Sequence, residues 1–180
     1  MLYSYKECMQ RYQSDYQLKL AIKKKEIFKI CKGIYSDKDV LNELELIAFK
    51  YSDAVFTMYS ALYYYNLTDV IPDYYYLRTD KDSAKIANRK VKQSFENDDN
   101  LNLGKVTILY DGVNINIYNK ERLLIEVVKN KNKLPFDYYK EVIQNYRKII
   151  SSLDSQLLQD YAMELPSANR VIETLELEVF

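Results

Sequence analysis

Residues 14–36 of the chain read SDYQLKLAIKKKEIFKICKGIYS, a stretch that predicts a basic helix followed by a β-hairpin. The helix is expected to begin at Ser14 or Asp15, which are favourable N-cap residues, and to run to about Lys25. After it, the turn Cys31-Lys32-Gly33 separates two short apolar segments that predict paired strands. Because the glycine lies at the tip of this tight turn, we expect it to adopt a positive φ.

Another amphipathic helix is predicted before this stretch. Apolar side chains recur there at helical spacing, at Tyr5, Cys8, Met9 and Tyr12. Polar residues interrupt the pattern at Gln13 and Ser14, so the chain is expected to turn tightly between the two helices. The basic helix has an apolar side that is expected to pack on the first helix, made of Leu18, Ala21 and Ile22. The order helix, tight turn, basic helix and hairpin predicts a winged helix-turn-helix.

In that fold the second helix enters the major groove of DNA, and the hairpin reaches the DNA backbone. The candidate DNA contacts on the basic helix and the hairpin are Tyr16, Gln17, Lys19, Lys23, Lys24, Lys29 and Lys32. Tyr16 and Gln17 lie nearest the helix start, so they are the candidates for reading bases. The alternatives are a lysine-rich solvated face and a surface that binds protein, because surface helices are often this basic.

The charge of the chain is balanced overall but divided along its length. Residues 1–36 carry eight basic and three acidic side chains, whereas the whole chain has 26 of each, so residues 37–180 carry a net charge of −5. We therefore expect a DNA-binding domain over residues 1–36 and a larger domain over residues 37–180. The expected partner of the basic domain is double-stranded DNA.

Composition argues against several other classes of protein. No apolar run is long enough to span a membrane and the N-terminus lacks an apolar signal core, so we expect a cytoplasmic protein. Two cysteines without metal-site spacing, three glycines and no histidine give no pattern for a metal, a cofactor or a phosphate-cradling loop. We therefore expect no cofactor and no enzymatic activity. The best enzymatic alternative would combine Asp111, Glu126 and Lys129, although a hairpin turn explains Asp111 better.

The larger domain is predicted to be a small mixed sheet flanked by helices, so the expected fold class is α+β. Strands are expected at residues 54–57, 74–79, 106–110 and 113–118, the last two joined by the turn Asp111-Gly112. Helices are expected at residues 37–50, 58–66, 83–95, 121–129, 135–151, 155–164 and 167–180. The helix over residues 83–95 would carry a second basic ridge, made of Lys85, Arg89 and Lys92. That ridge would serve either solubility or a longer DNA footprint.

Short motifs along nearly the whole chain resemble those of the AbiE-type antitoxins, the regulators of bacterial abortive-infection toxin–antitoxin pairs. Lys32-Gly33-Ile34-Tyr35 resembles the family's (R/K)G(V/I)Y end of the wing. Ser60-Ala61-Leu62, followed by Leu67-Thr68-Asp69 and Pro72, resembles its SAL, LTD and P helix end. The segment ERLLIE at residues 121–126 resembles its ER-T-L-x-D helix start, with Leu123 in place of threonine and Glu126 in place of aspartate.

This resemblance implies a cytoplasmic antitoxin that also represses its own operon by binding inverted repeats. It further implies that the larger domain counters a nucleotidyltransferase-like toxin, with or without stable direct binding. The motif residues that would serve this role are Ser60, Asp69, Glu121 and Arg122. They also have structural explanations, since Asp69 could cap a turn and Glu121 could form an ion pair with Arg122. The alternative functions are a stand-alone winged-helix regulator and a protein-binding adaptor without an antitoxin role.

Overall fold

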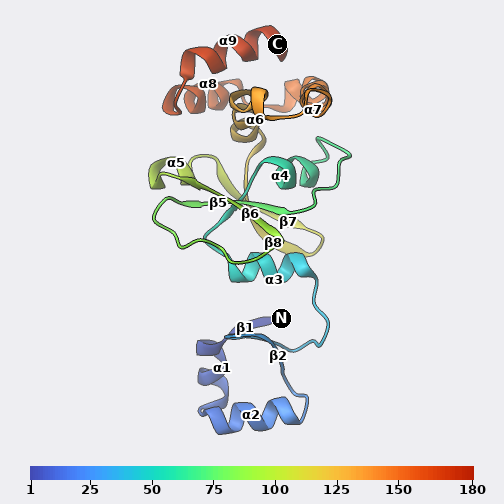
Figure 1. The fold of residues 1–180 in the computed structure, drawn as a ribbon, viewed down its shortest axis with the longest axis vertical. Coiled ribbons are helices and arrows are strands. Elements are labelled where there is room, and N and C mark those ends of the chain that lie inside the picture. Colours follow the sequence, from blue (N-terminus) through green and yellow to red (C-terminus); the bar gives the residue numbers. More distant parts are fainter. The chain divides into compact units, whose positions relative to one another are not determined.

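The computed structural model of the chain describes residues 1–97 and 99–180 in full and residue 98 by its backbone. It is an α+β protein that divides into two compact units, Met1–Ser52 and Asp53–Phe180 (Figure 1). The charge pattern placed the boundary after Ser36, whereas the contacts within the chain place it after Ser52. The difference arises because the loop after the hairpin and the helix α3 (Glu43–Lys50) belong with the N-terminal unit.

The N-terminal unit begins with strand β1 (Leu2–Ser4), which the sequence did not predict. The elements that follow are α1 (Tyr5–Tyr12), α2 (Asp15–Lys23), β2 (Phe28–Cys31) and β3 (Ile34–Ser36). The three strands form an antiparallel sheet in the order β1-β3-β2. The two helices and the hairpin confirm the predicted elements. Strand β1 has three residues and no periodic signal, so only its pairing with β3 defines it.

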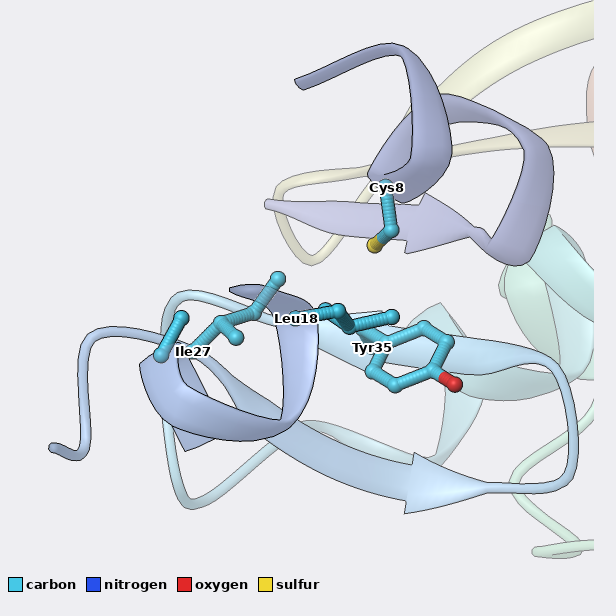
Figure 2. Close-up of a cluster of buried hydrophobic side chains, with 5 residues drawn as sticks. Cys8, Leu18, Ile27 and Tyr35 are labelled. Carbon is cyan, nitrogen blue, oxygen red and sulfur yellow. The ribbon is translucent and has the colours of Figure 1, made fainter. Parts of the chain in front are cut away.

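A small apolar core holds the N-terminal unit together. Its buried members are Cys8, Leu18, Ala21, Ile27 and Tyr35. Figure 2 shows Leu18 of α2, Ile27 and Tyr35 of β3 beneath Cys8 of α1. Helical spacing predicted three of these inner positions, and their burial turns the opposite face of α2 outward.

The helix expected to begin at Asp37 begins instead at Glu43, as α3. The Asp37 carboxylate pairs with the N-terminal amine of Met1, and the backbone N–H of Asp37 donates to the Met1 carbonyl at 3.3 Å. The hydrogen bond from that amine lowers the pKa of the Asp37 carboxyl group. Farther along, the Asn42 side chain accepts the N–H of Leu44 at 2.9 Å and caps α3. The start of the helix is therefore set by the Asn42 cap, while Asp37 is bonded to the chain terminus.

The C-terminal unit is built on a mixed sheet with the strand order β6-β5-β4-β8-β7. Its strands are β4 (Val55–Phe56), β5 (Tyr75–Asp80), β6 (Val91–Glu96), β7 (Lys105–Tyr110) and β8 (Val113–Tyr118). Strand β4 pairs antiparallel with β5 and parallel with β8. The predicted hairpin of β7 and β8 is confirmed, and its turn residues Asp111 and Gly112 have φ values of 48° and 74°.

The helix predicted over residues 83–95 is wrong. Residues 91–96 form strand β6, which pairs in parallel with all six residues of β5. The polar side chains of β6 have partners on β5. The Gln93 amide donates to Thr79 Oγ1 at 2.8 Å, and Arg78 Nε donates to Ser94 Oγ at 2.9 Å. These contacts with a distant segment of the chain favour a strand. The local sequence, from which the helix was predicted, contains no information about them.

Helices make up most of the remaining part of this unit. They are α4 (Met58–Tyr64), α5 (Asp98–Asn102), α6 (Lys120–Lys129), α7 (Phe136–Ile149), α8 (Ser155–Glu164) and α9 (Ala168–Glu178), with short 3-10 turns at Lys131–Lys133 and Ile150–Ser152. Helix α6 is buried along residues 122–128 and packs against α4, α8 and α9. In Figure 1 it lies between the sheet and the helices α8 and α9. No helix in the described part of the chain is both long and apolar enough to cross a membrane.

Candidate nucleic-acid interface

The turn between α1 and α2 is fixed by hydrogen bonds on both sides. Gln13 adopts a left-handed conformation with φ of 62°, and its N–H caps the end of α1. The Ser14 hydroxyl accepts the N–H of Gln17 at 3.2 Å and caps the start of α2. The Tyr5 hydroxyl of α1 donates to Asp15 Oδ1 at 2.9 Å. These bonds hold α2 in a defined direction relative to α1.

Helix α2 has two faces of opposite character. Leu18 and Ala21 are buried in the core of the N-terminal unit. The side chains on the exposed face are Tyr16, Gln17, Lys19 and Lys23, and Lys24, directly after the helix, is also exposed. Tyr16, in the first turn of the helix, is 72% exposed. An exposed tyrosine and an amide beside several lysines suit contact with both the bases and the phosphates of a nucleic acid.

The basic side chains of this region have little competition from carboxylates. Within the part of the chain that the structure describes, the candidate contacts Lys19, Lys23, Lys29 and Lys32 make no ion pair. Lys24 is 3.9 Å from Glu26 Oε1, but both side chains are more than half exposed, so this pair contributes little. The charges are therefore available to a phosphate backbone.

The hairpin of β2 and β3 turns at Gly33, whose φ of 79° confirms the predicted conformation. A Cβ at this position would meet nothing within 4 Å. The Gly33 carbonyl accepts the N–H of Tyr5 at 2.8 Å, which joins the turn to the first residue of α1. Lys32 in the turn and Lys29 on β2 are both exposed. The turn that carries Lys32 is thus anchored to the helix pair.

The second basic ridge does not form, because it required the helix that the structure replaces with a loop and a strand. Lys85 and Arg89 are exposed in the loop before β6, and Lys92 lies on β6. Lys92 Nζ is 4.4 Å from the centre of the Tyr74 ring, a cation–π contact. These three residues would share one face if the segment were helical, and outside a helix their spacing does not bring them together.

Two of the motif residues, Ser60 and Asp69, have very different surroundings. Ser60 is buried in α4, and its hydroxyl accepts the N–H of Tyr76 at 2.8 Å and donates to the Tyr74 carbonyl at 3.2 Å. It therefore anchors α4 to the beginning of β5. Asp69 is exposed, and the turn it was expected to cap is closed instead by the Thr68 hydroxyl, which accepts the backbone N–H two residues later.

Arg122 belongs to a buried cluster of four charged side chains, which is neutral overall. Its side chain is 0% exposed, and Nη2 lies 2.8 Å from Glu126 Oε1 and 3.6 Å from Glu96 Oε2. Arg78 donates to Glu96 Oε2 and Glu126 Oε2, both at 2.9 Å. Burial beside this cluster raises the pKa of Tyr118 to about 12. The cluster joins β5, β6 and α6, and removing one member would leave a buried charge uncompensated.

Glu121 does not form the expected ion pair with Arg122. Adjacent side chains on a helix point in different directions, and Glu121 Oε1 instead accepts the N–H of Asp154 at 3.1 Å. In the alternative enzymatic set, Glu126 is paired with two arginines and Asp111 occupies an exposed hairpin turn. Ser60, Glu121, Arg122 and Glu126 therefore make contacts within the fold, whereas the side chain of Asp69 is exposed.

Comparison with known proteins shows that this chain shares its fold with a solved structure. No protein-family model matches the chain, and no curated protein matches it. Among solved structures, the chain is similar to the RV2827C protein from Mycobacterium tuberculosis, with a TM-score of 0.63 and 11% sequence identity. The alignment covers 98% of this chain and 71% of that one. At this identity, what the two proteins share is the fold, over nearly the whole length of this chain.

Proposed function

We propose that this protein is a cytoplasmic, DNA-binding autorepressor and the antitoxin of a bacterial abortive-infection pair. The observation that carries the proposal is the exposed face of α2, where Tyr16 and Gln17 adjoin lysines that have no carboxylate partner. The motifs that resemble those of the AbiE-type antitoxins support the same function. The two units suit two tasks, since the cations of the proposed DNA-binding surface belong to the N-terminal unit.

In this function the N-terminal unit acts as a winged helix-turn-helix. Helix α2 enters the major groove, where Gln17 at its first turn can bond an adenine edge and Tyr16 can contact a neighbouring base. Lys19 and Lys23 neutralise phosphates, and Lys32 in the hairpin turn reaches the backbone of the same operator. The bond between the Gly33 carbonyl and α1 keeps the turn in place for this contact.

The C-terminal unit supplies the antitoxin function, directed against a nucleotidyltransferase-like toxin. Ser60 and Arg122 support this function indirectly, because both are buried, Ser60 with hydrogen bonds and Arg122 with an ion pair inside the fold. Asp69 is the motif residue whose side chain is open to a partner. Glu121 is half-buried and positions α8 through its bond to Asp154.

The DNA-binding proposal is tested by fluorescence anisotropy with a labelled duplex from the region upstream of the protein's own gene. The protein should bind this duplex more tightly than a scrambled duplex at the same salt concentration, and its affinity should fall as salt rises. Equal binding to both duplexes would contradict operator recognition. If the protein binds neither duplex in a salt-dependent way, the result would favour the protein-binding adaptor.

The antitoxin proposal needs a separate test in cells. Co-expression with a nucleotidyltransferase-like toxin from the neighbouring gene should restore growth, and so should a variant whose operator binding has been removed. Restoration by the wild-type protein alone would show that protection acts through repression. No restoration by either form would favour the stand-alone regulator.

A further inference from the structure

The C-terminal unit contains a cavity of about 300 Å³ that the proposed functions do not use. It lies where the start of α4 meets strands β5 and β6 and the segment that follows α6. Its lining includes Thr57, Tyr59, Tyr76, Arg78, Lys92 and Lys133. A volume of this size is at the lower end of pockets that hold small organic ligands.

The cavity is positively charged. None of the residues that line it is an aspartate or a glutamate. Within the described part of the chain, Lys92 and Lys133 make no ion pair with a carboxylate, although Lys92 contacts the Tyr74 ring. Arg78 is already bonded to two glutamates, so the net charge of the cavity comes from the two lysines. Two ammonium groups without a carboxylate partner favour an anionic ligand, and phosphate is the anion that lysine commonly binds in proteins.

A buried hydroxyl in the wall of the cavity also lacks a partner. Thr57 is 2% exposed, and its Oγ1 makes no hydrogen bond with any residue that the structure describes. The next residue, Met58, has a φ of 43°, a conformation that is uncommon outside glycine. Buried hydroxyls are nearly always hydrogen-bonded in native proteins. A polar ligand in the cavity would supply the missing partner.

Aromatic rings form another part of the wall. The ring centres of Tyr59 and Tyr76 are 4.8 Å apart, with the planes inclined by 36°, and both side chains are half-buried. Tyr59 is covered on another side by Tyr138, at 4.6 Å between ring centres. These contacts hold the two rings rigidly at the cavity. Rigid aromatic rings beside lysines without a carboxylate partner suit a ligand that combines a planar base with a phosphate.

We propose that this cavity binds a nucleotide. Lys92 and Lys133 hold its phosphate, Thr57 Oγ1 hydrogen-bonds a polar group of the sugar or base, and the base packs against Tyr76. The small volume selects a mononucleotide over a nucleic-acid strand. This proposal does not depend on the DNA-binding face of α2, so it can hold or fail independently of the operator assay.

The test is isothermal titration calorimetry of the full chain with each ribonucleoside monophosphate, and with inorganic phosphate and adenosine as partial ligands. One monophosphate should bind with a stoichiometry of one and more tightly than either partial ligand. Lys92→Ala combined with Lys133→Ala should weaken it at least about tenfold, because two charge-assisted contacts are lost. Lys85→Ala combined with Arg89→Ala removes the same charge from the loop before β6 and should bind normally.

Thr57→Val separates a ligand-binding hydroxyl from a structural one. Because the Thr57 hydroxyl has no protein partner, its removal should leave the melting temperature of the free protein unchanged or higher, while nucleotide affinity falls. The proposal is overturned if no monophosphate binds, if inorganic phosphate binds as tightly as the nucleotide, or if the paired lysine variant binds normally. If Thr57→Val lowers the melting temperature but leaves nucleotide affinity normal, the hydroxyl has a structural role and does not bind the ligand.

Discussion

Replacing Gly33 with alanine should loosen the N-terminal unit. Gly33 has a φ of 79°, in the left-handed region that side chains disfavour. Because a Cβ there would meet nothing within 4 Å, the penalty is conformational rather than steric, and we expect about 1–2 kcal/mol. A shift of the turn to relieve this strain would weaken the bond between the Gly33 carbonyl and the N–H of Tyr5.

The chain provides a local assay for this change. Both cysteines belong to the N-terminal unit, and Cys8 is 1% exposed in its core. In a Cys31→Ser background, the rate at which a thiol reagent labels Cys8 reports the opening of that unit. If opening and closing are fast relative to labelling, the expected loss of stability makes labelling about five to thirty times faster.

Gly112→Ala is the matched control, because Gly112 has a φ of 74° and also has open space around its missing Cβ. It lies in the β7–β8 hairpin of the C-terminal unit, so the same conformational penalty should leave Cys8 labelling unchanged. An unchanged labelling rate in Gly33→Ala would refute the reasoning about the turn. If both variants accelerate Cys8 labelling equally, the result would contradict the view that the two units open separately.

Three further outcomes are expected. Tyr16→Ala and Gln17→Ala should each change which duplex sequences are preferred, measured by competition binding, more than they change affinity for random duplex. A fragment of residues 53–180 should lose operator binding in an anisotropy assay but keep protection against the toxin in cells. Burial raises the pKa of Glu178, but the hydrogen bonds from Lys131 and Tyr139 and the nearby positive charges together lower it by more, so the pKa lies below its ordinary value of 4.5. This stabilisation is present above that pH and is lost as the pH falls through the lowered value, so in Glu178→Gln the unfolding free energy should fall less on acidification.

The N-terminal unit was largely predictable because its signals are local. Ser14 caps α2, the apolar spacing that includes Leu18 selects its buried face, and Gly33 marks the hairpin turn. The same spacing also predicted the exposed face of α2, because the residues opposite the buried positions of a helix face the solvent. Strand β1 was missed, since three residues carry no period and the strand exists only through its pairing with β3.

The C-terminal unit was predicted less completely because several of its features depend on distant segments. Strand β6 has a polar sequence that also fits a helix, and its parallel pairing with β5 decides between them. The buried cluster takes Arg78 from β5, Glu96 from β6, and Arg122 and Glu126 from α6, and no spacing rule relates these positions. The β7–β8 hairpin was predictable, because its turn signal lies within two adjacent residues.

The central claim is that the exposed face of α2 neutralises DNA phosphates. Its most direct test is the salt dependence of operator affinity in the variant that combines Lys19→Ala with Lys23→Ala. If each lysine contacts one phosphate, the slope of log affinity against log salt should become shallower by about two units. A variant combining Lys140→Ala with Lys148→Ala, which removes two exposed lysines from α7, should keep the wild-type slope. An unchanged slope and affinity in a folded Lys19 and Lys23 double variant would contradict the claim.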